Sequence, residues 1–131
     1  MIAVLDPSAA AELILNRPQK GKIEEYVLNA DLVIAPDLFI AEISNVFWKY
    51  HHFESLSSEI CEELVEKSIQ LIDKFESGST LYREAFQLAC ETKHPVYDAF
   101  YLVLTRRNNG ILVSLDKKLN AIAKSQKIKT K

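Results

Sequence analysis

Three short apolar runs divide the chain, and each is followed directly by an acid or a proline. The runs are Ile2 to Leu5, Leu32 to Ala35 and Ile111 to Leu115. The first ends at Asp6, the second at Pro36 and the third at Asp116. Continuous apolar runs of this length, bounded by turn residues, are typical of buried strands. We therefore predict a strand at each position.

Apolar residues recur at helical spacing between these runs. In the longest such segment, positions 38, 39, 43, 46, 47 and 50 form one stripe, which predicts a helix from about Asp37 to His52. Residues 57–74 mix Ile and Leu with Glu and Lys, which predicts an amphipathic helix running into a short strand before Gly78. The other expected elements are a helix capped near Ser8, helices over Ile23 to Asn29, Thr80 to Cys90, Pro95 to about Arg107 and Lys117 to Ser125, and a short edge strand at Ile128.

Strands that alternate with helices predict the fold class. The expected architecture is an α/β fold, a three-layer α/β/α sandwich with a mainly parallel central sheet, formed by residues 1–131 as one domain. In open parallel sheets the ligand crevice lies beyond the carboxyl ends of the strands. Asp6 and Asp116 each follow a predicted strand, so both are expected at that edge.

Composition removes several classes of function. Only three glycines are present, which excludes a glycine-rich phosphate loop. Cys61 and Cys90 lie far apart in predicted helices and form no CxxC pair, so both are expected to be reduced core residues of a cytoplasmic protein. The apolar stretch at the amino terminus is too short for a signal peptide, and no stretch is long enough to span a membrane.

Basic residues gather towards the carboxyl end of the chain. The net charge of −2 divides into +7 over residues 106–131 and −9 over residues 1–105. A basic end beside an acidic body suits the binding of phosphate groups. The same lysines also suit a solvated last helix and tail. Charge alone leaves both interpretations open.

Four aspartates have an ordinary structural explanation when each is taken alone. Asp116 can cap the last helix, and Asp6 can belong to an Asp-Pro turn. Asp98 lies near the start of its helix, where the helix dipole favours negative charge. Asp37 directly precedes the helix that contains Glu42, so we interpret it as the cap of that helix and not as a ligand.

Glu42 is harder to explain as a structural residue. It is four residues from both Leu38 and Val46, and so lies along the apolar stripe of its helix. A buried carboxylate needs a partner, and several carboxylates around a divalent cation offset one another's charge. An oxygen-rich set suits Mg²⁺ or Mn²⁺ better than zinc. The three histidines, His51, His52 and His94, show no ligand spacing and are expected to be surface or packing residues.

Four segments of the chain resemble the signature segments of the PIN-domain nucleases, and especially the VapC-like toxins of prokaryotic toxin–antitoxin pairs. They are Val4-Leu5-Asp6-Pro7-Ser8, Ala41-Glu42-Ile43-Ser44-Asn45-Val46, Val96-Tyr97-Asp98-Ala99-Phe100-Tyr101 and Leu112-Val113-Ser114-Leu115-Asp116-Lys117-Lys118-Leu119. The segments appear in the family's order and spacing over nearly the whole chain. Tyr-Asp-Ala-x-Tyr followed by a strand and Asp-Lys-x-Leu is a specific combination.

The resemblance implies a three-layer domain with Mg²⁺- or Mn²⁺-dependent endoribonuclease activity, a homodimer, and a cognate antitoxin that occupies the active-site groove. The family's acidic positions fall on Asp6, Glu42, Asp98 and Asp116, with Asp6 and Asp98 as the foremost candidates for direct metal ligands. Ser8 and Asn45 fall on supporting polar positions. From their place in the sequence, Arg106, Arg107, Lys117 and Lys118 are candidates for contacts with RNA phosphates.

Two rival functions remain. A phosphatase would use Asp6 as nucleophile, but it normally needs a second acid two residues later, where Ser8 stands. A catalytically silent PIN-like module would keep the fold and bind only RNA or protein. The complete set of four acids argues against the silent module, and Ser8 ranks the phosphatase below the nuclease.

Overall fold

A computed structural model describes all residues, 1–131. In chain order the elements are β1 (Ile2–Leu5), α1 (Pro7–Ile14), α2 (Lys20–Asn29), β2 (Leu32–Pro36), α3 (Leu38–Glu54), α4 (Ser58–Gln70), β3 (Lys74–Glu76), α5 (Gly78–Thr92), α6 (Val96–Arg107), β4 (Ile111–Val113) and α7 (Lys117–Ser125). The strands predicted from the apolar runs are all present, and β3 lies where a short strand before Gly78 was expected.

The strands form one parallel sheet of four, in the order β3-β2-β1-β4. Ala3 of β1 lies opposite both Val33 of β2 and Ile111 of β4. Because β1 is a central strand, the residue that follows it emerges in the middle of the sheet's carboxyl edge. The parallel sheet predicted from the sequence is confirmed.

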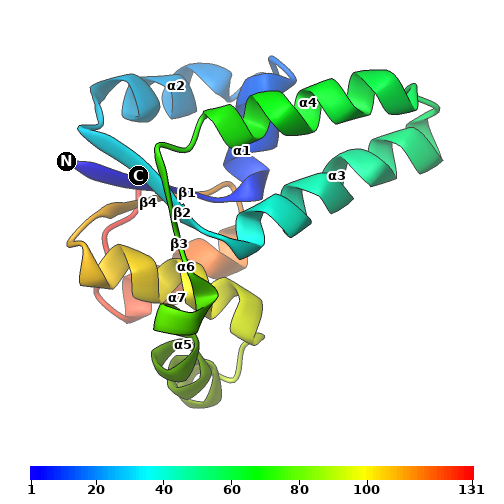
Figure 1. Cartoon of the computed structure of the whole chain (residues 1–131). Helices are drawn as coiled ribbons and strands as arrows, with labels where there is room; N and C mark the ends of the chain where they lie inside the picture. The colour runs from blue at the N-terminus through cyan, green and yellow to red at the C-terminus, as the bar shows by residue number, and fades with distance from the viewer.

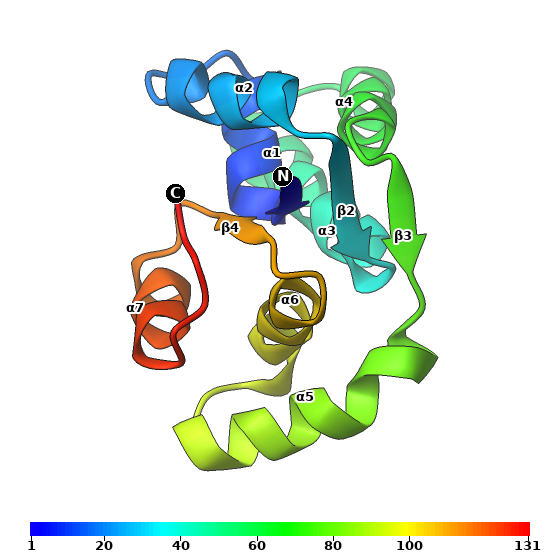
Figure 2. The same cartoon turned by 90° about the vertical axis from the view of Figure 1, so that its left-hand side faces the viewer.

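Helices cover both faces of the sheet and form the predicted three layers (Figures 1 and 2). One core packs α1, α2, α3 and α4 against one face, and the other packs α5, α6 and α7 against the opposite face. Successive residues of β1 alternate between the cores, since Ala3 and Leu5 belong to the first and Val4 to the second. Burial on both faces explains why the strands are continuously apolar rather than alternating.

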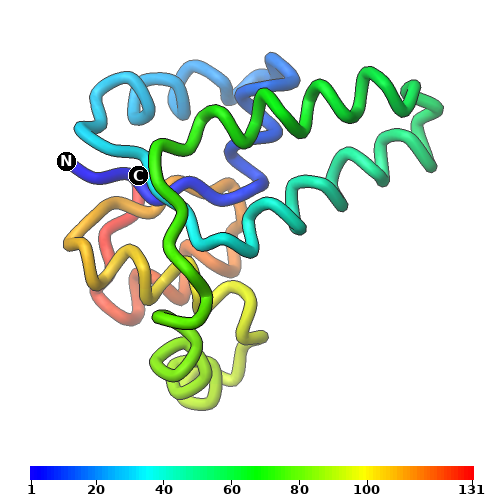
Figure 3. The backbone as a smooth tube through the Cα atoms, in the orientation of Figure 1, coloured from blue at the N-terminus to red at the C-terminus, as the bar shows by residue number.

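Helices α3 and α4 form an antiparallel hairpin that extends beyond the edge of the sheet (Figures 1 and 3). The α3 helix ends where Ser55 adopts a left-handed conformation, with φ of 58°. Ser57 then caps α4 by accepting a hydrogen bond from the backbone N–H of Ile60. The inner half of α3 is anchored in the core by Phe39, Ile43 and Phe47. Its outer half carries exposed side chains.

The structure corrects several predicted helix starts. Asp6, not Ser8, caps α1, since its carboxylate accepts from the N–H of Ala9. Ser77, not Thr80, caps α5. Asp37 makes no capping bond to its own helix α3, and instead its Oδ1 accepts from the N–H of Gly78 at 3.1 Å. Asp37 therefore joins the starts of α3 and α5.

Three smaller expectations are also corrected. The last strand is shorter than predicted and ends at Val113, because Ser114 and Leu115 turn towards α7. The edge strand expected at Ile128 is only an isolated bridge between Leu112 and Thr130. Both cysteines are free thiols, but only Cys61 is buried, while Cys90 is exposed on α5. No helix combines the length and the apolar character that crossing a membrane requires.

Candidate active site

A pocket of about 260 Å³ lies beyond the carboxyl end of β1. Its lining residues come from four separate segments: Asp6, Pro7, Ser8, Glu42, Asn45, Val46, Asp98, Tyr101 and Asp116. The pocket thus brings together the four predicted acids and both predicted supporting residues. It lies at the sheet edge expected from strand direction, because Asp6 follows β1 and Asp116 follows β4.

Asp6 is the most buried of the four acids, with only 5% of its surface exposed. Burial raises the pKa of this carboxyl to about 6, and the nearby charge of Asp116 adds to the rise. Hydrogen bonds from Ser114, Ser8 and the N–H of Ala9 oppose it, since they stabilise the carboxylate. The site therefore holds a carboxylate at an energetic cost in the absence of a cation.

Two serines connect Asp6 to the β4 side of the pocket. Ser8 donates to Asp6 at 2.7 Å and accepts from the N–H of Leu115 at 3.0 Å. Ser114 donates to the other oxygen of Asp6 and accepts from the N–H of Asp116 at 3.0 Å. Ser114 is fully buried, and it was not among the site residues predicted from the sequence. A polar residue inside the apolar run Ile111 to Leu115 was the signal available for it.

Glu42 is paired with a tyrosine. The hydroxyl of Tyr101 donates to Glu42 Oε1 at 2.6 Å, and the tyrosine side chain is 1% exposed. Burial raises the pKa of Glu42, while the charges of Asp98 and Asp6 add to the rise and the tyrosine bond opposes it. The pKa of Tyr101 is also raised, by burial and by Glu42. Glu42 therefore has a neutral partner in the protein itself, and its sharing of a divalent cation with the other carboxylates stays a prediction.

Asp98 has a histidine partner that the sequence analysis missed. His94 Nε2 lies 2.7 Å from Asp98 Oδ2, and both side chains are partly buried. The expectation that His94 is only a surface or packing residue is therefore wrong. Its spacing of four residues before Asp98 was the available signal. The expectation holds for the other two histidines, because His51 bonds the carbonyl of Leu56 and His52 stacks on Trp48.

Asp116 is a helix cap and also lines the pocket. Its Oδ1 accepts from the N–H groups of Lys118 and Leu119 at 2.9 and 3.2 Å. One carboxylate oxygen is therefore engaged by α7, and the other makes no hydrogen bond with the protein. The capping role expected of this residue taken alone is confirmed, and it is compatible with a role in the pocket.

The donor set is suited to a hard divalent cation, although the side chains are not assembled as a cage. No group of three or more His, Cys, Asp or Glu side chains is close enough to hold a metal ion. Each carboxylate is instead held by a protein partner. Their charges nevertheless act on one another, because the pKa values of Asp6 and Glu42 are both raised in part by neighbouring acids. The polar side chains that line the pocket offer a metal ion oxygen ligands and no imidazole or thiolate, and such a set matches Mg²⁺ or Mn²⁺.

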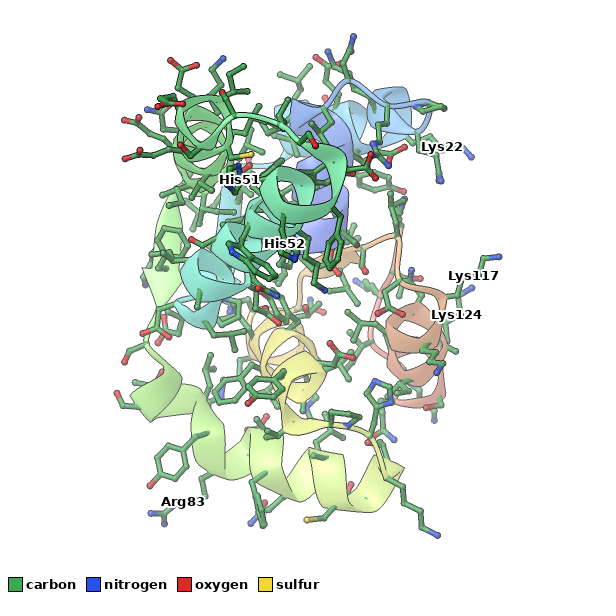
Figure 4. All side chains as sticks on the ribbon, turned by 90° about the vertical axis from the view of Figure 1, so that its right-hand side faces the viewer. Lys22, His51, His52, Arg83, Lys117 and Lys124 are labelled. Carbon is green, nitrogen blue, oxygen red and sulfur yellow. The ribbon has the colours of Figure 1, made fainter.

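The predicted basic contacts divide into two groups. Lys117 and Lys118 are exposed in the first turn of α7, directly after Asp116, and Figure 4 shows Lys117 reaching outward from this helix. Arg106 and Arg107 lie at the far end of α6 from Asp98. Both pair with Glu84 of α5, at 3.0 and 3.5 Å. The structure therefore does not bring the two arginines to the pocket, because α6 carries them to the opposite edge of the sheet.

Comparison with known proteins gives a consistent result. The PIN domain family model matches residues 3–125. The chain is 32% identical to Ribonuclease VapC3 of Pyrobaculum aerophilum over an alignment of 123 residues, which covers 91% of this chain and 92% of the relative.

Two solved structures share the fold. The protein PAE2754 of Pyrobaculum aerophilum superposes with a TM-score of 0.74 at 20% identity, covering 93% of this chain and 87% of the other. VapC20 of Mycobacterium tuberculosis, described as a toxin that cleaves the sarcin-ricin loop, gives a TM-score of 0.66 at 14% identity, covering 91% and 93%. Because the PIN domain model matches nearly the whole length of this chain, the chain belongs to the PIN-domain family.

Proposed function

We propose that this protein is a metal-dependent endoribonuclease and the toxin of a toxin–antitoxin pair. The observation that carries the proposal is the convergence of Asp6, Glu42, Asp98 and Asp116 on one open pocket. The relative from Pyrobaculum aerophilum, a ribonuclease by name, supports RNA as the substrate. Residues 1–131 would form one nuclease domain.

The four carboxylates would hold Mg²⁺ or Mn²⁺, with Asp6 and Asp98 as direct ligands. When bound, such an ion lowers the pKa of a water for attack on a phosphodiester and offsets negative charge on the phosphate. Ser8 and Ser114 keep the Asp6 carboxylate oriented towards the pocket. Asn45 offers an uncharged polar side chain at the pocket rim. Lys117 and Lys118 would contact phosphates of the bound strand.

The partners follow from the same proposal. A cognate antitoxin would cover the carboxylate pocket and so prevent RNA from entering. The two free thiols suit a reducing compartment, which supports a cytoplasmic location. Homodimer formation stays a prediction, and sedimentation of the purified chain measures it directly.

Cleavage of a mixed cellular RNA pool tests the function. Wild type is expected to give discrete cuts with Mg²⁺ or Mn²⁺ and none with EDTA, and Asp98→Asn should lose the cuts while remaining folded. Asp31→Asn is the matched control, because Asp31 is an exposed acid that pairs with the chain's own amino terminus, away from the pocket. Uncut RNA with a folded, metal-binding wild type would instead favour the silent binding module.

A further inference from the structure

Three aromatic rings form an exposed cluster on the outer half of α3. Trp48 and His52 are stacked, with ring centroids 5.0 Å apart and planes 7° from parallel. Phe53 meets the edges of both rings, at 4.6 Å from His52 and 6.3 Å from Trp48. Trp48 is 52% exposed and Phe53 is 71% exposed. The cluster Trp48-His52-Phe53 therefore leaves aromatic surface open to solvent.

The cluster is continuous with the carboxylate pocket. Asn45 lines that pocket, and Trp48 and Lys49 follow it by three and four residues, so they lie one turn farther out. Phe53 follows Lys49 by another turn. Each four-residue step corresponds to about 6 Å along the helix. Figure 4 looks at α3 from the tip of the hairpin, and His52 lies there on the side of α3 turned towards α6.

Positive charge accompanies these rings. A second pocket, of about 310 Å³, is lined by Arg17, Lys49, Tyr50, Phe53 and Glu54. The Arg17 guanidinium lies 5.3 Å from the centroid of the Tyr50 ring. The second pocket thus offers two cations and one acid, Glu54, beside the exposed ring of Phe53. Along α3, Lys49 lies about two turns and Phe53 about three turns beyond Glu42. An aromatic surface with cations at its margin suits nucleobases joined by phosphates.

We propose that Trp48, His52 and Phe53, with Lys49, form a stacking surface for bases of single-stranded RNA that flank the phosphate in the carboxylate pocket. This inference rests on the proposed ribonuclease function and deepens it, because it names the side chains that would hold the bases next to the cut phosphate. Stacking on aromatic rings tolerates any base, since each base has a π-face. The surface would hold the strand while other contacts select the cut site.

Another exposed aromatic surface serves as a contrast. Tyr82 and Phe86 lie on α5, which packs against the outer side of α6, and the groove beside them is lined by no residue of the carboxylate pocket. Arg83 of the same helix points away from α3 in Figure 4. Phe86 is 63% exposed and so matches Phe53 in type and exposure. Phe86→Ala is therefore the control for Phe53→Ala.

Trp48 is the only tryptophan of the chain, so its fluorescence reports on the proposed surface directly. The probe is oligoadenylate of about a dozen nucleotides, a length that suits single-strand sites. Titration in the Asp98→Asn background keeps the RNA intact. We expect oligoadenylate to quench Trp48 and an abasic ribose-phosphate strand of equal length to leave it unchanged. Phe53→Ala should weaken binding, measured by anisotropy, roughly 5- to 150-fold, and Phe86→Ala should not.

The outcomes separate this inference from the ribonuclease proposal. Wild type that cuts cellular RNA, with no quenching by oligoadenylate and equal binding by the two phenylalanine variants, would overturn the stacking surface and leave the nuclease standing. The stacking surface would also be overturned if Trp48→Ala abolished dimer formation but left RNA affinity unchanged, because α3 would then be a dimer interface. If wild type does not cut RNA at all, that result would count against the ribonuclease proposal itself.

Discussion

Asp6 is the most buried acid of the pocket, and its ionisation is therefore linked to stability. Its pKa is raised from 3.8 to about 6 in the folded chain, chiefly by burial. The folded protein then binds a proton more tightly than the unfolded chain does. The stabilising contribution of protonated Asp6 is fully present below pH 3.8 and is lost as pH rises through about 6.

Asp6→Asn should therefore stabilise the metal-free protein near neutral pH. A neutral amide has no ionisation penalty, so its advantage should grow between pH 3.8 and about 6 and reach a few kcal/mol at pH 7. Thermal unfolding of both proteins across this range, with EDTA present, measures the difference. A stability difference that does not change with pH would show that the pKa of Asp6 is not raised. The variant should also lose RNA cleavage.

At the scale of an element, α7 depends on Asp116 for its start, and the pocket uses the same side chain. Its Oδ1 accepts from the N–H groups of Lys118 and Leu119. Buried Leu119 and Ala123 then fix the helix against the second core. Loss of the cap and loss of the charge are separable effects, because serine can also cap a helix without carrying a charge.

Two substitutions at Asp116 should separate these roles. Asp116→Ala is expected to lose both the cap and the charge, and so to cost about 1 kcal/mol of stability. Asp116→Ser should retain most of that stability. Both should lose metal-dependent cleavage, since neither supplies a carboxylate. Urea unfolding and the RNA assay measure the two effects, and a fully active Asp116→Ser would show that the residue is only a cap.

The loop that leads from α6 into β4 shows a second element-scale constraint. Asn109 adopts a positive φ of 47°, whereas Gly110 does not have a positive φ. Gly110 is required by lack of space, because a Cβ at this position would lie 2.8 Å from the carbonyl oxygen of Ile2 in β1. A glycine lets β4 start close to β1.

Gly110→Ala should accordingly destabilise the fold by about 1 to 3 kcal/mol, the usual cost of overpacking. Gly21→Ala is the control, since a Cβ at this position of α2 meets nothing within 4 Å. Alanine there should raise stability by about 0.5 to 1 kcal/mol through its better helix propensity. Chemical denaturation of the two variants measures the contrast, and equal effects would contradict the steric explanation.

Over the whole molecule, the four basic residues predicted to contact RNA divide between the carboxyl edge of the sheet and the opposite, amino edge. Lys117 and Lys118 begin α7 beside the carboxylate pocket, whereas Arg106 and Arg107 end α6 at the opposite edge and pair with Glu84. Proximity in sequence to Asp98 did not indicate this separation, because a helix of twelve residues carries its two ends far apart. The positive charge near the pocket is therefore smaller than the excess of +7 over residues 106–131 suggests.

Salt dependence of RNA binding should reveal which charges meet phosphates. Lys117→Gln and Lys118→Gln are each expected to weaken binding and to reduce the slope of log K against log salt by about 0.7, the value for one single-strand phosphate contact. Arg106→Gln should leave the slope unchanged, and its ion pair with Glu84 is worth less than about 1 kcal/mol of stability. A reduced slope in Arg106→Gln would place RNA at the far edge.

The sequence by itself determined the elements and the edge where the acids meet. Continuous apolar runs predicted the strands because both faces of this sheet are buried, and the acids after β1 and β4 followed from strand direction. The resemblance to PIN-domain nucleases then selected all four acids together, although local patterns alone gave Asp6, Asp98 and Asp116 ordinary structural roles.

Only the tertiary structure decided the partner of Glu42 and the pairing of Asp6 with Ser114. Tyr101 meets Glu42, and Ser114 meets Asp6 across 108 positions of sequence. Pairings of this kind depend on how α3, α6 and the strands are placed around the sheet, and no periodicity along one element contains that information. The exposure of Trp48 and Phe53 was decided in the same way, because their helix α3 extends past the sheet that would otherwise have covered them.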